Sequence, residues 1–337
     1  LTLRAVALAA VIVLIVQPES LTEPGFQMSF AATTALVAVF GALRGRGEGR
    51  WRPPKWAQPV LAVVISSAVA GAATAPFAAA HFNQVAQYGL LANLLTVPLM
   101  GLLVIPAALI AGLLVPVGLS GPPLAVMGWG IDWILGVARW VAGMEGATWP
   151  LKAPGPAVLP LLALGALWLI LWQARPRWAG IVPVVAAVVI WAGTERPPLL
   201  IAQSGGLVGV LTTEGRALSR GRGDGFTAGI WLENDGDAAG QDQAFQRLPP
   251  LDPWQAEIAG QRFVHLSGRG WRDRLGDACA LGVVIVATTP DGSLPEGCVI
   301  WGPRYLAKTG AIAVYPGPQG PRFLWARRAE GARPWVQ

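Results

Sequence analysis

Charged side chains are scarce in this sequence of 337 residues: only 13% are charged, whereas 53% are hydrophobic. This composition excludes an intrinsically disordered chain and indicates a membrane protein. The deficit is uneven, because residues 1–194 hold long uncharged runs and residues 197–337 resemble an ordinary soluble domain. We therefore predict a membrane domain over residues 1–194 and a C-terminal domain over residues 197–337.

Acidic residues are few in the membrane part, so most of the excess positive charge gathers there. Up to Arg196 we count nine Arg and two Lys against five Glu and one Asp, a net charge of +5, and the remainder adds +1 to give +6. The basic character therefore belongs to the flanks of membrane segments. It is not the footprint of a basic nucleic-acid-binding domain.

The start of the sequence lacks an initiator Met, a basic stretch and a cleavage site. Its first residue, Leu1, already borders an apolar run. We therefore expect no signal peptide, and we expect the sequence to be an internal or C-terminal piece of a larger protein.

Seven apolar segments approach the length of about 20 residues that a helix needs to cross a bilayer. They are residues 1–16, 26–43, 57–80, 88–114, 124–141, 154–172 and 178–193. The fifth is the weakest, because it contains Asp132 and Arg139. The basic loops at residues 44–55 and 175–177 both lie inside under the positive-inside rule only if all seven segments cross. That topology puts the first residue inside and the C-terminal domain outside the cytoplasm.

The stretch at residues 76–98 is apolar at both ends and polar in its middle. His81, Gln84 and Tyr88, spaced i, i+3, i+7, fall on one face of a predicted helix. Polar groups in hydrocarbon are costly unless they are paired or wet, so this face is either the wall of a conduit or a solvated helix start. The candidates for lining a conduit are Gln27, Ser29, His81, Asn83, Gln84, Gln87 and Asn93. For Gln27 and Ser29, a local helix cap is the alternative.

Asp132 and Arg139 lie seven residues apart, two turns along one helical face of the fifth segment. Charges in a membrane segment face the bundle interior, pair with each other or reach to the interface. The sequence leaves two interpretations open: a structural pair or interfacial snorkelling, and a charged part of a conduit wall.

Tryptophan is frequent near the ends of the apolar segments. The residues are Trp51, Trp56, Trp140, Trp149, Trp172, Trp178 and Trp191. This placement is typical of the aromatic belts at membrane interfaces and requires no role in stacking on nucleic acid.

After residue 197 the pattern changes to short strands separated by short helices, which predicts a small α/β layer fold. The strands are expected at residues 199–202, 207–212, 216–219, 281–287, 298–301 and 311–315. Helical turns are expected at residues 226–232 and 305–309, whereas residues 238–261 are expected to be irregular.

Residues 219–226 (SRGRGDGF) contain three glycines and two arginines. They form either a surface loop or a phosphate-binding loop, which would need a strand before it and a helix start after it. No GK[ST] sequence follows.

Cys279 and Cys298 are the only cysteines, and both fall in the domain predicted to lie outside. Oxidising compartments favour disulfides, so we expect these two to be joined. Two buried thiols are the alternative.

Two stretches of the membrane part together resemble a known family. PESLTEPGFQMSF, starting at Pro18, and HFNQVAQYGLLANLLTVP, ending at Pro98, are similar to the membrane domain of the ComEC family of competence DNA-uptake channels. The resemblance implies a channel that passes one DNA strand across the cytoplasmic membrane. It also implies a C-terminal metallo-β-lactamase-like domain, which the tail GAIAVYPGPQGPRFLWARRAEGARPW resembles in reduced form. The family's N-terminal soluble domain would precede this sequence.

The C-terminal domain departs from the family pattern at the metal site. A metallo-β-lactamase site needs an HxHxDH motif with further His and Asp ligands, but this chain has only two His. His81 belongs to the membrane part, and His265 stands alone in the sequence. One imidazole cannot hold two metals, and no CxxC pair exists to replace the missing ligands. We therefore expect no metal, no cofactor and no enzymatic activity.

These observations predict a polytopic helical membrane bundle of about seven helices followed by a small α/β domain. The predicted function is passage of single-stranded DNA across the cytoplasmic membrane in natural transformation. The expected partners are the DNA strand, membrane lipid and other proteins of the competence machinery, and a homo-oligomer is left open. The alternatives are a secondary transporter of another polar solute, with helices broken at Pro98 and Pro106, and a membrane-anchored structural or interaction protein.

Overall fold

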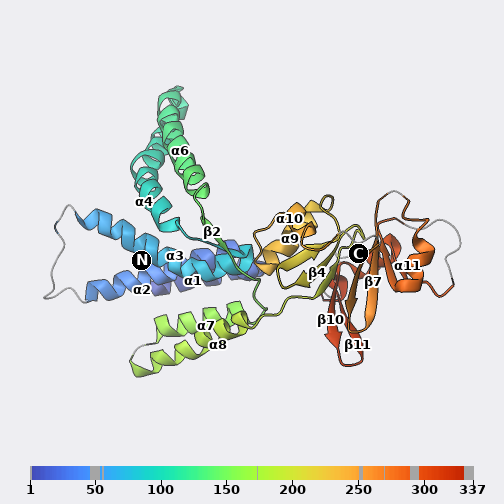
Figure 1. Cartoon of the computed structure of the whole chain (residues 1–337). Helices are drawn as coiled ribbons and strands as arrows, with labels where there is room; N and C mark the ends of the chain where they lie inside the picture. Colours follow the sequence, from blue (N-terminus) through green and yellow to red (C-terminus); the bar gives the residue numbers. More distant parts are fainter. Residues whose placement is uncertain are drawn as a thin grey trace. The chain divides into compact units, whose positions relative to one another are not determined.

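A computed structural model describes residues 2–45, 54, 57–172, 174–249, 253–268, 270–288 and 296–329. The chain forms two compact units, Leu1–Gly193 and Thr194–Gln337. Figure 1 follows the first in blue to green and the second in yellow to red. Most of the predicted basic loop at residues 44–55, together with Trp51 and Trp56, lies outside the described residues.

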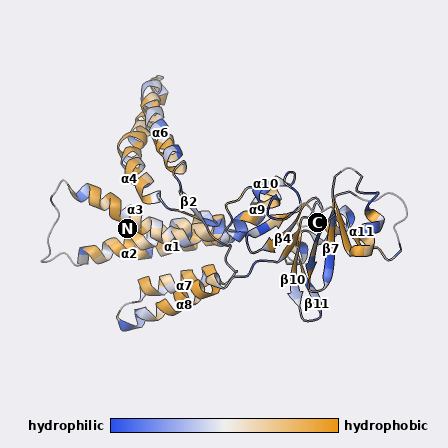
Figure 2. Ribbon diagram, in the orientation of Figure 1, coloured by the Kyte–Doolittle hydropathy of each residue, from blue (hydrophilic) through white to orange (hydrophobic). Residues whose placement is uncertain are grey.

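The first unit is helical, as the long apolar runs predict. Figure 2 shows hydrophobic residues along its helices, with hydrophilic ones concentrated near some of their ends. Its α-helices are α1 (Leu3–Val16), α2 (Pro24–Gly45), α3 (Ala57–Phe82), α4 (Gly89–Leu99), α5 (Ile105–Leu114), α6 (Gly121–Ala142), α7 (Val158–Leu171) and α8 (Ile181–Ala192). The 3₁₀ turns are η1 (Pro18–Thr22), η3 (Val115–Val117) and η4 (Arg175–Gly180), and two short strands are β1 (Gln84–Ala86) and β2 (Thr148–Pro150).

Five helices of the described chain are long and apolar enough to cross a membrane. They are Pro24–Arg44, Ala57–Phe82, Gly89–Val117, Gly121–Ala142 and Arg175–Ala192. The fifth predicted segment, weakest by sequence, is thus a full-length helix. By contrast, α1 and α7 have 14 residues each, which is about 21 Å of helix against a hydrocarbon core of about 30 Å. The prediction of seven spans therefore includes two helices that are shorter than the core.

The helix from Gly89 to Val117 is continuous, and the expected break at its prolines is wrong. The π-helical turn η2 (Met100–Val104) follows Pro98, and Pro106 comes directly after this turn, in the first turn of α5. A π turn absorbs the register change that a proline imposes without ending the helix.

Helix pairs in the first unit approach closely where one residue is glycine. A Cβ placed on Gly165 of α7 would lie 2.7 Å from the carbonyl oxygen of Gly180, beside α8. On α6, a Cβ on Gly130 would lie 2.7 Å from Cγ2 of Val104. Small residues at such contacts let helix backbones approach in a membrane, where packing replaces the hydrophobic effect.

The second unit contains two sheets. The five-stranded sheet has the order β11-β10-β3-β4-β5 and is antiparallel throughout. The four-stranded sheet has the order β6-β7-β8-β9, with β7, β8 and β9 parallel. The strands are β3 (Leu199–Ile201), β4 (Val208–Thr212), β5 (Gly215–Leu218), β6 (Trp254–Ile258), β7 (Gln261–Leu266), β8 (Val283–Val286), β9 (Ile300–Trp301), β10 (Ile312–Gly317) and β11 (Gly320–Trp325).

The two sheets face each other across the main apolar core, and helices cover their outer faces. Leu199 and Ile201 of one sheet pack with Phe263 and Ile285 of the other. The outer helices are α9 (Gly225–Asp235) and α10 (Gln241–Phe245) on the first sheet and α11 (Leu275–Leu281) on the second, and the remaining helices are α12 (Pro303–Thr309) and α13 (Ala326–Ala329). The result is a four-layered α/β unit, in agreement with the predicted fold class.

The irregular segment expected at residues 238–261 is wrong, because it contains α10 and β6. Trp254 of β6 is 6% exposed and belongs to the core between the sheets. The alternation of apolar and polar residues in this strand is obscured in the sequence by the polar residues on either side. Burial against the facing sheet stabilises the strand despite its weak intrinsic β propensity. The glycine-rich residues 219–226 follow β5 and lead into α9 at Gly225.

Charged side chains are buried in the second unit as one bonded group. Arg216 is completely buried, and its guanidinium pairs with Asp235 and donates to the carbonyl oxygens of Gly209 and Pro197. Arg196 donates to the same carboxylate at 2.9 Å. A buried charge is tolerated when it is paired and hydrogen-bonded, as this one is.

Cys279 of α11 and Cys298, which precedes β9, are joined by a disulfide with their Cα atoms 5.0 Å apart. The bond connects the outer helix to the edge strand of the four-stranded sheet. It lies in the domain for which the sequence predicts an oxidising compartment.

Candidate functional site

The start of α2 and the end of α3 are joined by a hydrogen bond between side chains. Nε2 of His81 lies 2.8 Å from Oε1 of Gln27, whose Nε2 donates to the carbonyl oxygen of Leu21 at 2.9 Å. The bond to Leu21 fixes the orientation of the Gln27 amide, so that its oxygen faces His81. An amide oxygen only accepts, and Nε2 of His81 is therefore the donor. Two polar residues from the two stretches that the sequence singled out therefore meet in space.

The chain leaves the helix directly after Phe82, so the predicted helical face of His81, Gln84 and Tyr88 is wrong. Asn83 has φ of 53°, a left-handed conformation that Asn adopts more readily than most residues and that ends a helix. Residues 84–86 then form β1. The spacing i, i+3, i+7 places residues on one face only if the helix continues through all of them. Here the helix ends before Asn83.

β1 pairs with β2 in an antiparallel ribbon, in which Gln84, Val85 and Ala86 face Pro150, Trp149 and Thr148. Two further backbone bonds extend it at its ends: Leu151 N donates to Asn83 O at 2.7 Å, and Gln87 N donates to Ala147 O at 3.0 Å. We call this element, residues 83–87 with 147–151, the ribbon. It joins the end of α3 to the end of α6, over sixty residues along the chain.

Polar contacts continue beyond the ribbon. The hydroxyl of Tyr88, at the start of α4, donates to the carbonyl oxygen of Glu145 at 3.2 Å. A Cβ on Gly146, which has positive φ, would lie 3.4 Å from Oε1 of Gln87. Gln84 and Gln87 are both exposed. The ends of four helices, α2, α3, α4 and α6, thus carry one polar region with exposed amide groups.

Two of the predicted conduit residues lie outside this polar region. Ser29 is exposed on α2, where its carbonyl oxygen accepts from Thr33, and Asn93 is half-buried on α4. Neither takes part in the bond between His81 and Gln27. Of the seven residues predicted to line a conduit, the structure therefore brings five together: Gln27, His81, Asn83, Gln84 and Gln87.

The residues of β2 are the ones that sequence reasoning missed as part of this region. Thr148 and Trp149 are exposed beside the predicted polar stretch. The signal that could have found them is the sequence between Gly146 and Pro154, which is too short and too rich in proline for a helix. Only the pairing with β1, which is nonlocal, reveals their place.

The charges on α6 do not form the structural pair that was one alternative. Asp132 and Arg139 are both exposed, and no ion pair of the described residues includes either side chain. Seven residues of helix separate them by about 10 Å along the axis, which exceeds the reach of an ion pair. Their exposure leaves interfacial snorkelling and a conduit wall as the remaining interpretations.

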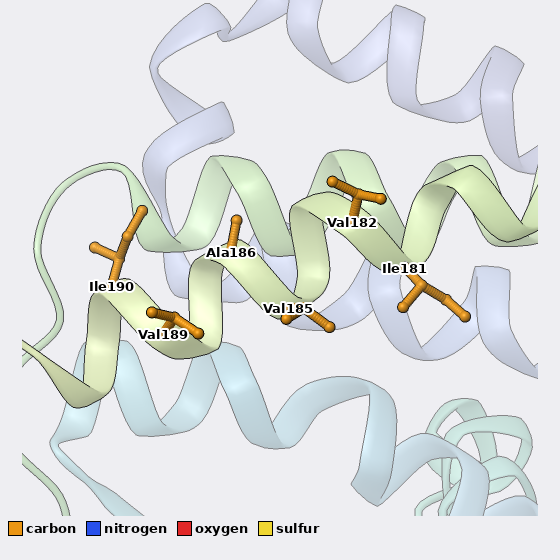
Figure 3. A pocket seen from close by; sticks show the side chains of 6 residues that line it. All are labelled: Ile181, Val182, Val185, Ala186, Val189 and Ile190. Carbon is orange, nitrogen blue, oxygen red and sulfur yellow. The ribbon is translucent and has the colours of Figure 1, made fainter.

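A hollow beside α8 has an entirely apolar lining, shown in Figure 3. Its residues are Ile181, Val182, Val185, Ala186, Val189 and Ile190. Exposed aliphatic side chains on a helix of membrane-spanning length are suited to contact lipid. This surface offers no polar group to a nucleic acid or a polar solute.

His265, the second histidine, lies inside the second unit. It is 2% exposed, its Nε2 is 3.1 Å from the carbonyl oxygen of Gly205, and its Nδ1 has no partner. Burial lowers its pKa to about 4, against the opposing effect of the bond to Gly205. Over the part of the chain that the structure describes, no three His, Cys, Asp or Glu side chains gather in a group that could hold a metal ion.

A bundle of apolar helices with a polar region at their ends, followed by a layered α/β unit, defines a polytopic membrane protein with a C-terminal domain. Residues 1–176, more than half of the sequence, match the family model described as "Competence protein". The chain therefore belongs to the competence protein family and has a role in competence and DNA uptake. No curated protein and no solved structure matches the chain. The family match ends before the second unit, so its resemblance to a metallo-β-lactamase stays a prediction.

Proposed function

We propose that the membrane unit passes a single DNA strand across the cytoplasmic membrane during natural transformation. The observation that carries the proposal is the ribbon, whose exposed amides lie between helices long enough to span the membrane. Non-helical backbone next to a bilayer needs water or protein around it, since hydrocarbon cannot satisfy its polar groups. A water-filled path beginning at the ribbon meets that need.

The chemistry of the polar region suits a strand that must move. Gln84 and Gln87 offer exposed neutral amides, which donate and accept and so serve both phosphates and base edges. A row of fixed cations would hold the phosphates too strongly, because a conducting site must bind weakly enough to release. Within residues 83–87 and 147–151 the sequence contains no Lys or Arg.

We further propose that the polar region and the second unit lie on the outer side of the cytoplasmic membrane. The basic residues Arg175 and Arg177, between α7 and α8, belong inside by the positive-inside rule. Since α8 follows them, its end and the unit after it belong outside, where the disulfide of Cys279 and Cys298 is chemically favoured. A membrane-impermeant maleimide should label Lys308→Cys in intact cells stripped of outer barriers, and protection of this residue would contradict the orientation.

For the second unit we propose a non-enzymatic role in which it binds the entering DNA or another protein of the uptake machinery. The scarcity of histidine in the sequence supports this, because hydrolytic metal centres use several imidazole or carboxylate ligands. Nuclease activity of the purified chain that disappears on chelation, and returns with added metal, would contradict it.

The transporter alternative depended on helices broken at Pro98 and Pro106. The helix through both prolines is continuous, so the half-helix ends that would bind an ion or solute are missing there.

A deletion strain tests the proposed function most directly. We expect transformation by purified linear DNA to be lost in the deletion strain and restored by the wild-type chain expressed from another locus. Entry of label from one strand into the cytoplasm should be lost with it, while binding of duplex DNA at the cell surface remains. Transformation at the wild-type frequency in the deletion strain would contradict the proposal.

A further inference from the structure

Trp149 occupies an unusual position for a tryptophan of a membrane protein. It is 67% exposed and lies on β2 of the ribbon, in register with Val85. By the alternation of a strand, its neighbours Thr148 and Pro150 project to the opposite face. An exposed indole thus stands on the same face of the ribbon as Val85, whereas Gln84 and Thr148 lie on the opposite face.

Four other tryptophans of the first unit have an aromatic or a hydrogen-bond partner. Trp168 and Trp172 stack on each other at 4.1 Å, and Trp133 and Trp191 donate their indole N–H to carbonyl oxygens of Leu95 and Lys152. Trp149 belongs to a segment without helical structure, where backbone groups need water. An aromatic belt accounts for tryptophans at the ends of apolar helices, whereas Trp149 lies on a strand between two such ends.

A basic residue follows this indole closely in the sequence. Lys152 is exposed and follows Trp149 by three residues, at most about 10 Å along an extended chain. Its carbonyl oxygen accepts from Trp191 at 2.8 Å, which ties this part of the backbone to the end of α8. Grooves that bind single strands combine aromatic platforms for the bases with cations for the backbone, and these two residues provide one of each.

The acidic residues of the same region favour contact with bases over phosphates. Glu19, Glu23 and Glu145 are exposed in η1, before α2 and before the ribbon. Carboxylates repel phosphates, so the phosphate backbone of a DNA strand contributes little binding energy at this face except near Lys152. Stacking on a neutral ring is unaffected by this repulsion and accepts every base, as transport without sequence preference requires.

We propose that Trp149 is a base-stacking platform for the entering DNA strand and that Lys152 meets the phosphate next to the stacked base. This inference rests on the proposed function and adds to it the residues that first contact the strand. A single platform with one cation holds the strand briefly and lets it advance, because each stacked base contributes only a modest share of affinity.

The test uses the full chain purified in detergent and a single-stranded oligothymidylate that carries 5-iodouracil. We expect irradiation to crosslink the oligonucleotide to Trp149, as identified by mass spectrometry of the peptide. Trp149→Leu should weaken binding by at least about fivefold, the lower limit for loss of a stacked base, whereas Trp149→Phe should retain most of it. Trp140→Leu is the matched control, since Trp140 is 56% exposed on α6 and lies outside the ribbon.

Lys152 has a separate readout. Lys152→Gln should reduce the slope of log affinity against log salt concentration by about 0.7, the value for one phosphate contact on a single strand. An unchanged slope would overturn the assignment of Lys152. Equal binding by wild type, Trp149→Leu and Trp149→Phe, or equal loss in Leu and Phe variants, would overturn the assignment of Trp149.

Cellular transformation separates this inference from the proposed function. If the deletion strain transforms normally, the proposed function fails and Trp149 has no strand to contact. If the deletion abolishes transformation but Trp149→Leu at normal abundance supports it fully, only the stacking inference fails. A loss with Trp149→Leu that Trp149→Phe restores supports both.

Discussion

In the second unit the guanidinium of Arg216 is fully buried and each of its three nitrogens donates a hydrogen bond, whereas in the membrane unit the amide of Gln84 lies exposed on the ribbon. Paired polar groups inside a protein fix its structure, because no other arrangement satisfies them. Exposed polar groups such as this amide bond to water or to another partner. Polar side chains therefore stabilise the second unit, whereas on the ribbon we propose that they contact the DNA strand.

The largest effect is expected from removing the carboxylate that Arg216 and Arg196 share. Asp235→Ala leaves a buried guanidinium without its counter-charge, which costs about 3–5 kcal/mol of stability. Pulse proteolysis of the full chain in detergent should show the second unit opening at much lower denaturant concentration.

Glu257→Ala is the control for this comparison, because Glu257 pairs with Arg262 while both side chains are well exposed. Exposed pairs contribute little, so its denaturation profile should stay near that of the wild type. A similar loss in both variants would mean that burial does not distinguish the two ion pairs.

Acid should destabilise the second unit through His265. Burial holds its pKa at about 4, below the ordinary 6.5, so the unfolded chain binds the proton more tightly than the folded one. Stability is then full above pH 6.5, falls as the pH drops towards 4, and loses about 3 kcal/mol in total.

His265→Gln should remove this dependence while keeping an N–H for the carbonyl oxygen of Gly205. Its stability should change little between pH 7 and pH 4.5, as followed by pulse proteolysis. An equally steep acid loss in the variant would assign the effect to other groups.

In the membrane unit, the close approach of α7 and α8 should be sensitive to a single methyl group. Gly165→Ala puts a Cβ 2.7 Å from the carbonyl oxygen of Gly180, and overpacking of this kind costs about 1–3 kcal/mol. We expect lower abundance of the chain in membranes. Gly112→Ala on α5, where a Cβ meets nothing within 4 Å, should leave abundance unchanged, and equal losses would show that helix packing at Gly165 is unimportant.

The sequence predicted the helices of the membrane unit well, because long apolar runs admit few alternatives in a bilayer. It failed where one residue or a distant partner decides the structure. Asn83 reverses the backbone at the end of α3, and residues 148–150 complete the ribbon from over sixty residues away. The helical spacing of His81 and Tyr88 in the sequence predicted neither the end of α3 at Asn83 nor the pairing of the two strands.

The second unit shows the same limit in another form. Apolar strands such as β8 were found from their composition, but β6 was missed because only the facing sheet makes Trp254 a core residue. The candidate site was predicted in part: Gln27 and His81 were chosen separately, and their contact required the fold. Thr148 and Trp149 could not be chosen without the pairing of β1 and β2.

The smallest expected effect is also the one that bears most directly on transport. Gln84 is exposed on the ribbon and pairs in register with Pro150. If it contacts the DNA strand, Gln84→Leu should lower DNA uptake about fivefold at normal membrane abundance, the equivalent of one hydrogen bond of about 1 kcal/mol. Leucine has a similar length, adds no charge and removes the donor and acceptor that replace water around a phosphate or base edge.

Thr74→Val provides the matched control, because the hydroxyl of Thr74 bonds to the carbonyl oxygen of Ala70 within α3 and lies away from the ribbon. Both variants exchange a polar side chain for an apolar one in the same unit, so a general effect on insertion would lower uptake in both. A loss confined to Gln84→Leu supports contact with the strand. Normal uptake with Gln84→Leu at equal abundance would instead mean that the amide is merely solvated and makes no contact with the strand.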